Sequence, residues 1–144
     1  MKARDFLKIL RDHEIAAAIR AAEKRTSGEI RVFISRKDVD DPLAAAQEHF
    51  LKLGMSKTRD HNAVLIYVAP RARKFAVVGD KGVHERCGDE FWRQLADEMS
   101  GYFRDSRFTR GIIHGVHKAG ELLAAQFPRA GDDKNELPDR IEGD

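Results

Sequence analysis

The uninterrupted apolar run from Ala63 to Ala69 constrains the fold of this chain more than any other segment. Successive side chains of a β-strand point to opposite faces of a sheet, so a strand made only of apolar residues must be covered on both faces. The run is far shorter than the roughly 20 residues that a helix needs to cross a bilayer. It therefore predicts a central strand with helices on both sides of the sheet, and no membrane span.

The segments around this strand alternate between helical and strand patterns. Apolar residues recur at helical spacing in 5–25, 42–53, 89–103 and 108–127, and further strands are predicted at 29–35 and 73–78. A strand–helix–strand unit gives a parallel pair with a right-handed crossover, whereas a tight turn gives an antiparallel pair. We therefore expect an α/β fold, with residues 1–128 forming a single three-layer αβα domain around a small mixed sheet.

Charge narrows the classes of partner. The chain has 144 residues, which suits one domain, and its 26 Lys and Arg residues nearly balance 24 Asp and Glu residues. The net charge of +2 does not supply the basic field typical of nucleic-acid binders, so we expect no nucleic-acid partner. Residues 129–144 hold six acidic and three basic residues with few apolar ones, which predicts an acidic, disordered tail.

The single cysteine, Cys87, cannot form an intramolecular disulfide, and nothing else indicates an oxidising compartment. We interpret it as a structural or surface thiol, because a nucleophile needs a base aligned with it in space. The apolar stretch near the N-terminus is too short for a signal peptide. These features predict a cytoplasmic protein.

Four oxygen-bearing side chains are expected to meet at one edge of the sheet: Glu29, Asp60, Asn62 and Asp80. Glu29 begins the first strand, Asn62 precedes the second, and Asp80 follows the third, which runs antiparallel and so ends where the other two begin. Carboxylate and amide oxygens are the ligands that Ca²⁺ and Mg²⁺ prefer. We interpret this edge as a divalent-cation site. The alternative is that these residues are solvated or cap neighbouring helices.

The opposite edge collects basic residues, namely Arg36, Lys37, Arg71, Arg73 and Lys74. Ligands in open α/β sheets favour the carboxyl ends of parallel strands, so an anion site is a second interpretation for the chain. Charges that keep a hairpin tip soluble would explain the same residues, and this ordinary explanation is the favoured one.

Three further motifs have structural explanations. His114 and His117 have the spacing of zinc ligands, but helical geometry turns both away from the apolar stripe, toward solvent or a partner. The acidic segment 38–41 contains a D-x-D motif like that of aspartyl-phosphate phosphatases, yet it is also typical of a helix start. Gly111 and Gly115 favour close packing between helices.

Several short segments together resemble the TPM-domain family, which is named after a thylakoid-lumen acid phosphatase, a photosystem II repair protein and a nematode receptor modulator. They are Ser27–Val32, Asn62–Tyr67, Arg73–Gly82, and Phe103–Phe108 with Gly111, and the resemblance extends over Thr26–Pro128. The ending Asn135–Asp139 is similar to that of short, soluble bacterial members.

The resemblance implies an αβα domain, divalent-cation binding in several members, and acid phosphatase activity on artificial phosphoesters in plant members. It also implies a role in protein quality control or membrane-protein maintenance. This chain has Asn62-Ala63 where the family commonly has Asn-Gly. The positions that match the family's cation site are Glu29, Asp60, Asn62 and Asp80, with Gly79 and Gly82.

Two functions follow as hypotheses. The first is a non-catalytic module that binds a divalent cation, Ca²⁺ or Mg²⁺, or a protein partner, with the acidic tail and the His114/His117 face as contact surfaces. The second is metal-assisted hydrolysis of a small phosphoester, in which Asp60, Asp80 and Glu29 hold the cation while Lys81 or Arg59 offsets developing charge. Asp60, Asp80 and Lys81 are then the candidate catalytic residues. Carboxylates without a recognisable nucleophile motivate this second hypothesis, but the sequence shows no complete catalytic apparatus, and we therefore favour the binding module.

Overall fold

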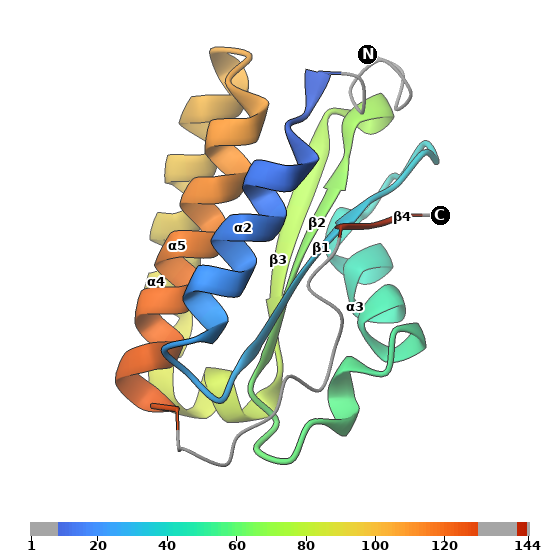
Figure 1. The fold of residues 1–144 in the computed structure, drawn as a ribbon. Coiled ribbons are helices and arrows are strands. Elements are labelled where there is room, and N and C mark those ends of the chain that lie inside the picture. Colours follow the sequence, from blue (N-terminus) through green and yellow to red (C-terminus); the bar gives the residue numbers. More distant parts are fainter. Residues whose placement is uncertain (1–8, 130–140, 144) are drawn as a thin grey trace.

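The computed structural model describes residues 9–129 and 141–143. The strands are β1 (Glu29–Ile34), β2 (Ala63–Ala69), β3 (Lys74–Gly79) and β4 (Ile141–Gly143). The helices are α2 (Asp12–Glu23), α3 (Pro42–Lys52), α4 (Lys81–Arg104) and α5 (Phe108–Gln126). Short 3₁₀ turns occupy Met55–Lys57 and Pro70–Ala72. In Figure 1, α2, α4 and α5 cover one face of the sheet and α3 covers the other.

The sheet has the strand order β3-β2-β1-β4. β1 runs parallel to β2 from the pair Glu29–Ala63 onward, and β3 runs antiparallel to β2 from the pair Val64–Gly79. Every residue of β2 is buried, and one apolar cluster packs on each face of this strand. These observations confirm the predicted α/β fold and explain the apolar run, because β2 has no solvent-facing side.

The glycines of α5 let this helix approach α4 closely. A Cβ atom at Gly111 would lie 2.6 Å from Phe103 Cε1, and one at Gly115 would lie 2.9 Å from Met99 Sδ. These distances are too short for real Cβ contacts. The G-x-x-x-G motif therefore serves helix packing, as predicted. The predicted helix start before Pro42 is also confirmed, since Asp41 accepts a hydrogen bond from the Ala44 amide at 3.1 Å.

Helix α4 begins earlier than predicted. The sequence predicts a helix from Asp89, whereas α4 starts at Lys81 and changes direction at Gly88, which has φ 75° and ψ 175°. The first part of α4 carries few apolar residues, with Val83 buried and Cys87 partly buried. This helix start matters for the acidic edge, because it makes Asp80 an N-cap residue.

The acidic tail differs from its prediction where it can be described. Residues 130–140 lie outside the described residues, but Ile141–Gly143 form β4 and pair in parallel with Val32–Ile34 of β1. The prediction that this tail does not pack is wrong for these residues. Two contacts accompany this pairing: Glu142 Oε1 lies 2.6 Å from Nη2 of the buried Arg31, and Ile141 packs against the apolar cluster on the helical face of the sheet.

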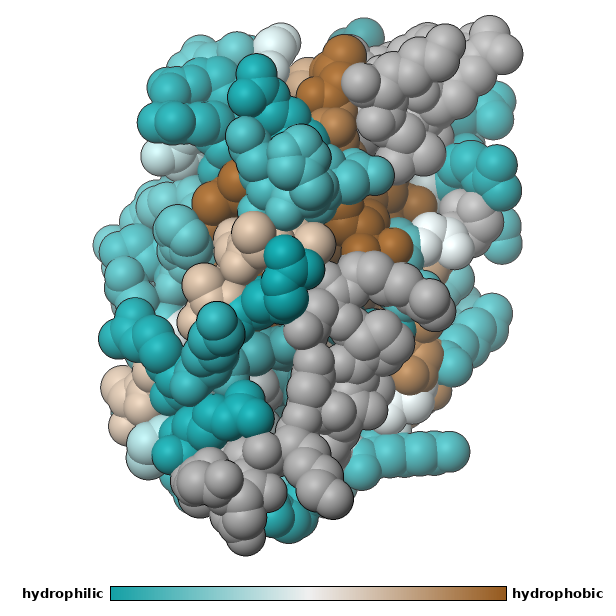
Figure 2. Space-filling view, viewed as in Figure 1, coloured by the Kyte–Doolittle hydropathy of each residue, from teal (hydrophilic) through white to brown (hydrophobic). Residues whose placement is uncertain are grey.

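The surface of the helical layer is mostly hydrophilic, and Figure 2 shows hydrophobic residues gathered near the middle of the same view. None of the helices in the described part of the chain is long and apolar enough to cross a membrane.

Candidate functional site

The acidic edge is built by three chain segments whose main chains lie next to one another. Glu29 opens β1 and pairs with Ala63, and the Asp80 amide donates a 2.9 Å hydrogen bond to the Ala63 carbonyl. Asn62 directly precedes this pair. The mixed sheet therefore brings Glu29, Asn62 and Asp80 to one edge, as the predicted strand directions require.

Asp80 is the most constrained carboxylate at this edge. Its Oδ1 accepts a 2.8 Å hydrogen bond from the Lys81 amide and so caps α4. Its Oδ2 is buried, has no hydrogen bond, and lies 3.4 Å from His61 Nδ1. The Asp80 side chain is only 12% exposed. One carboxylate oxygen thus stabilises the helix, while the other makes no hydrogen bond and faces His61 Nδ1.

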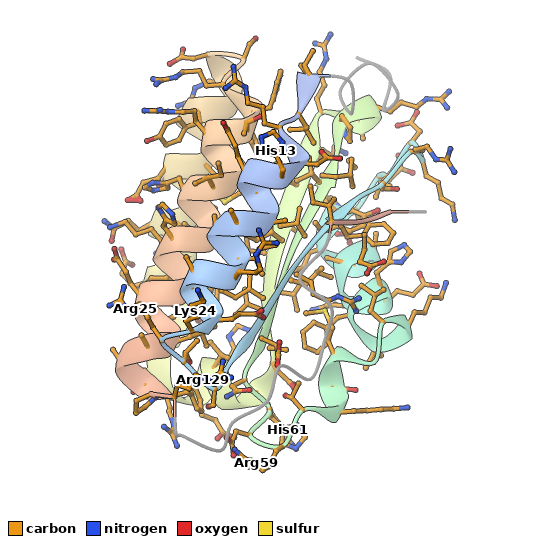
Figure 3. All side chains as sticks on the ribbon, in the orientation of Figure 1. His13, Lys24, Arg25, Arg59, His61 and Arg129 are labelled. Atoms are coloured by element: carbon orange, nitrogen blue, oxygen red, sulfur yellow. The ribbon has the colours of Figure 1, made fainter. Side chains whose placement is uncertain are left out.

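The turn that carries Asp60 and His61 packs against the start of α4. A Cβ atom at Gly82 would lie 2.5 Å from the His61 carbonyl oxygen and 2.6 Å from that of Asp60. The Gly82 amide also donates to the His61 carbonyl at 3.0 Å, and His61 adopts a left-handed φ of 50°. Only glycine allows this approach. In Figure 3, Arg59 and His61 mark the turn at the lower end of the molecule.

The remaining predicted ligands differ in accessibility. Asn62 is 1% exposed and its Nδ2 donates to Ser27 Oγ at 3.1 Å, and Glu29 is buried as well. The Asp60 side chain is 44% exposed, and its Oδ2 lies 3.8 Å from Arg59 Nε. Within residues 9–129 and 141–143, no three His, Cys, Asp or Glu side chains are grouped so that they could hold a metal ion. A cation at this edge would therefore need main-chain oxygens besides the carboxylates.

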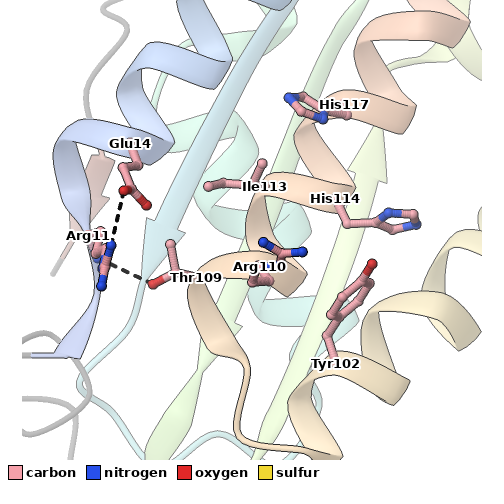
Figure 4. A pocket seen from close by; sticks show the side chains of 8 residues that line it. All are labelled: Arg11, Glu14, Tyr102, Thr109, Arg110, Ile113, His114 and His117. Carbon is pink, nitrogen blue, oxygen red and sulfur yellow. Dashed lines mark hydrogen bonds and ion pairs between the residues drawn. The ribbon is translucent and has the colours of Figure 1, made fainter.

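A hollow of about 640 Å³ lies on the helical layer, away from the acidic edge, and is lined by residues of α2, α4 and α5 (Figure 4). Its polar side chains are largely engaged with one another. Arg11 Nη1 lies 3.3 Å from Glu14 Oε1, and His114 Nε2 lies 2.6 Å from Glu98 Oε1. His117 is exposed, as predicted, but His114 is not fully solvated because Glu98 and Tyr102 of α4 cover it. The sequence could not show this, since α4 lies outside the local helical pattern.

Cys87 is partly buried against the apolar cluster that α4 and α5 share. Removal from water raises the pKa of the Cys87 thiol, and the neighbouring Arg86 opposes this shift only in part. Because the thiolate is the reactive form, we expect iodoacetamide at pH 7.5 to alkylate Cys87 several-fold more slowly than free N-acetylcysteine. Mass spectrometry over time measures this rate, and urea-unfolded protein serves as the fast control. A rate in the folded protein equal to that control would contradict a buried thiol.

The profile of the TPM domain matches residues 3–122 of this sequence. The chain belongs to the TPM-domain family. A comparison with functionally curated proteins gives no match.

Solved structures of similar fold include one that matches this chain over almost its whole length. The NMR structure of the BA42 protein from the psychrophilic bacterium Bizionia argentinensis is 38% identical, with a TM-score of 0.86, and the match covers 94% of this chain and 96% of that one. The N-terminal domain of a protein from P. gingivalis is 19% identical, with a TM-score of 0.58 over 77% of this chain and 72% of that one. The N-terminal domain of the cg2496 protein from Corynebacterium glutamicum is 16% identical, with a TM-score of 0.53 over 83% and 71%. The latter two support the fold alone.

Proposed function

We propose that this TPM domain is a binding module that takes up a divalent cation where the turn of Asp60 and His61 packs against Gly82 at the start of α4. The observation that carries the proposal is the buried Asp80 Oδ2, which has no hydrogen bond although Oδ1 of the same carboxylate caps α4. A buried carboxylate oxygen without a hydrogen bond is unfavourable unless a positive group faces it, and the nearest nitrogen, His61 Nδ1 at 3.4 Å, is positive only when the imidazole is protonated. A bound cation would supply that group.

The chemistry of the turn favours Ca²⁺ over Mg²⁺. Calcium accepts main-chain carbonyl oxygens and irregular geometry, whereas magnesium requires a near-regular octahedron. The carbonyl oxygens of Asp60 and His61 face the start of α4, and the exposed Asp60 carboxylate belongs to the same turn. Asn62 and Glu29 flank the turn along the sheet edge and complete the proposed oxygen-bearing surroundings.

Thermal unfolding with Ca²⁺, with Mg²⁺ and with a chelator tests this function. Ligand present at about 100 times its Kd stabilises a protein by about 2.7 kcal/mol. In a chain of this size we therefore expect Ca²⁺ to raise the melting temperature by roughly 5–10 °C. Asp80→Asn removes the charge but keeps a good N-cap residue, so α4 is expected to remain capped and the calcium response to be lost.

The matched control is Asp97→Asn, which removes an exposed carboxylate from the same helix. This variant should respond to Ca²⁺ like the unmodified protein. An unchanged response in Asp80→Asn would contradict the proposed site.

The same samples, assayed on p-nitrophenyl phosphate, distinguish a binding module from a phosphatase. Cation-dependent turnover that Asp80→Asn abolishes would favour the phosphatase, with Asp60, Asp80 and Lys81 as its residues.

A further inference from the structure

A groove of about 600 Å³ opens at the other end of the sheet, where β1 and β2 finish. It lies between the β2–β3 turn and the α4–α5 turn, far along the strands from the acidic edge. The residues that line it are Val68, Pro70, Arg73, Lys74, Phe75, Ser100, Phe103, Arg104, Ser106 and Phe108. A cavity therefore exists at the basic end of the sheet, where the sequence suggested an anion site.

The floor of the groove is aromatic. The Phe75 and Phe103 rings meet edge to face with centroids 5.1 Å apart, and the Phe103 and Phe108 centroids are 6.0 Å apart. Val68 and Pro70 are buried beside them. Flat apolar groups bind well to such surfaces, because aromatic side chains offer a large, rigid contact area.

The rim of the groove is basic. All three ionisable residues in its lining are cationic. Lys74 Nζ is engaged, since it donates to the Asp40 carbonyl at 2.7 Å. Arg73 and Arg104 are exposed, and neither guanidinium group has a hydrogen bond or ion pair with any residue in the described part of the chain. Two guanidinium groups are thus free to face a ligand in the groove.

The N-terminus of one helix lies beside the groove. Helix α5 begins at Phe108, and its N-cap residue Arg107 makes no side-chain capping hydrogen bond. The first amides of such a helix and its dipole attract anions. Arg73 and Ser106, which border the groove on opposite sides, both adopt left-handed φ values, of 56° and 59°. These conformations are unfavourable for residues other than glycine.

From the basic rim, the aromatic floor and the free guanidinium groups, we propose that this groove binds a small organic anion with a flat apolar body, such as an aromatic carboxylate. Arg73 and Arg104 would hold the carboxylate, and the phenylalanine floor would hold the ring. Paired hydrogen bonds from guanidinium to carboxylate are among the strongest in proteins. The position agrees with the preference of ligands for the carboxyl ends of parallel strands in open α/β sheets. The volume suits one small molecule.

Amide NMR spectra of the full chain, titrated with 2-naphthoate, test the proposal. Saturable shifts are expected at residues 73–75, 100–104 and 106–108. Acetate carries the charge without the ring and 2-naphthalenemethanol the ring without the charge, so each should bind at least tenfold more weakly. The variant Arg73→Asn/Arg104→Gln should lose at least tenfold in affinity, since asparagine tolerates the left-handed conformation and the fold is kept.

The control Arg71→Ala/Arg93→Ala removes the same number of charges from exposed positions outside the groove, and its affinity should stay within twofold. Equal losses in the two double variants would overturn the proposal, as would shifts scattered over all basic surfaces. Equal binding of the neutral alcohol would overturn it too.

Sedimentation with phosphatidylglycerol vesicles distinguishes a free organic anion from an anionic lipid headgroup as the ligand. Groove-dependent binding to vesicles without binding of free 2-naphthoate would assign the groove to a membrane surface and contradict the proposal. Asp80→Asn should bind 2-naphthoate normally, so failure of the calcium site leaves this test intact.

Discussion

Replacing Gly82 with alanine is expected to lower the free energy of unfolding by roughly 2–3 kcal/mol, even though alanine is the better helix former. The added Cβ would lie 2.5 and 2.6 Å from the carbonyl oxygens of His61 and Asp60. Both are main-chain atoms, so the whole turn must move to make room. Urea unfolding measures the change. The calcium-dependent rise in melting temperature should also shrink, because the same turn faces Asp80.

Gly101→Ala is the matched control for this substitution. Gly101 lies in the same helix, and the nearest atom to its added Cβ would be Arg104 Nη2 at 3.9 Å, which is ordinary contact. Alanine should therefore stabilise the chain there by up to about 1 kcal/mol. If both variants change the free energy of unfolding in the same direction, crowding between residue 82 and the Asp60–His61 turn is not the cause of the loss in Gly82→Ala.

Replacing Arg31 with methionine is expected to lower the free energy of unfolding by about 2–3 kcal/mol and to release β4. The side chains of Arg31 and Glu142 are 5% and 17% exposed, and their 2.6 Å contact joins β1 to β4. Losing one partner of a buried pair typically costs 3–5 kcal/mol. The loss here should be smaller, because a three-residue strand can detach and return Glu142 to water. Hydrogen exchange should become at least tenfold faster in β4 and along the facing edge of β1.

The exposed pair between Lys52 and Glu48 provides the contrast. Its charged atoms are 3.0 Å apart, but the two side chains are 62% and 63% exposed. The Lys52 hydrogen bond, and then its charge, lower the pKa of Glu48. Lys52→Met should let that pKa rise toward its ordinary value without a measurable change in melting temperature.

For Arg31→Met, the contradicting outcome is that β4 keeps its protection from hydrogen exchange. That result would show that main-chain pairing alone holds β4 on β1.

The fold was predictable because its main signals are local. The apolar run in β2 requires cover on both faces, and the residues before Pro42 form a helix cap within four positions. The start of α4 and the strand β4 were not predictable in the same way. Glycine at position 82 lowers helix propensity, and β4 depends on a buried arginine more than one hundred residues away along the chain.

The acidic edge was predictable as a place but not as an arrangement of atoms. Strand direction alone brings Glu29, Asn62 and Asp80 to one edge, since parallel and antiparallel partners begin and end there. Sequence patterns do not show that one carboxylate oxygen of Asp80 caps α4, or that the Glu98 side chain hydrogen-bonds to His114. Both contacts come from the packing of separate elements.

The sequence by itself determined the α/β class, the central strand and the two oppositely charged ends of the sheet, because hydrophobic periodicity and strand direction are short-range properties. The tertiary structure decided which charged groups are engaged and which have no hydrogen-bond partner in the described part of the chain. Lys74 is bound to a main-chain carbonyl, while Arg73 and Arg104 border a groove and Asp80 Oδ2 is buried without a donor. The physical reason is that hydrogen-bond partners are chosen by three-dimensional packing, to which neighbours in sequence contribute little.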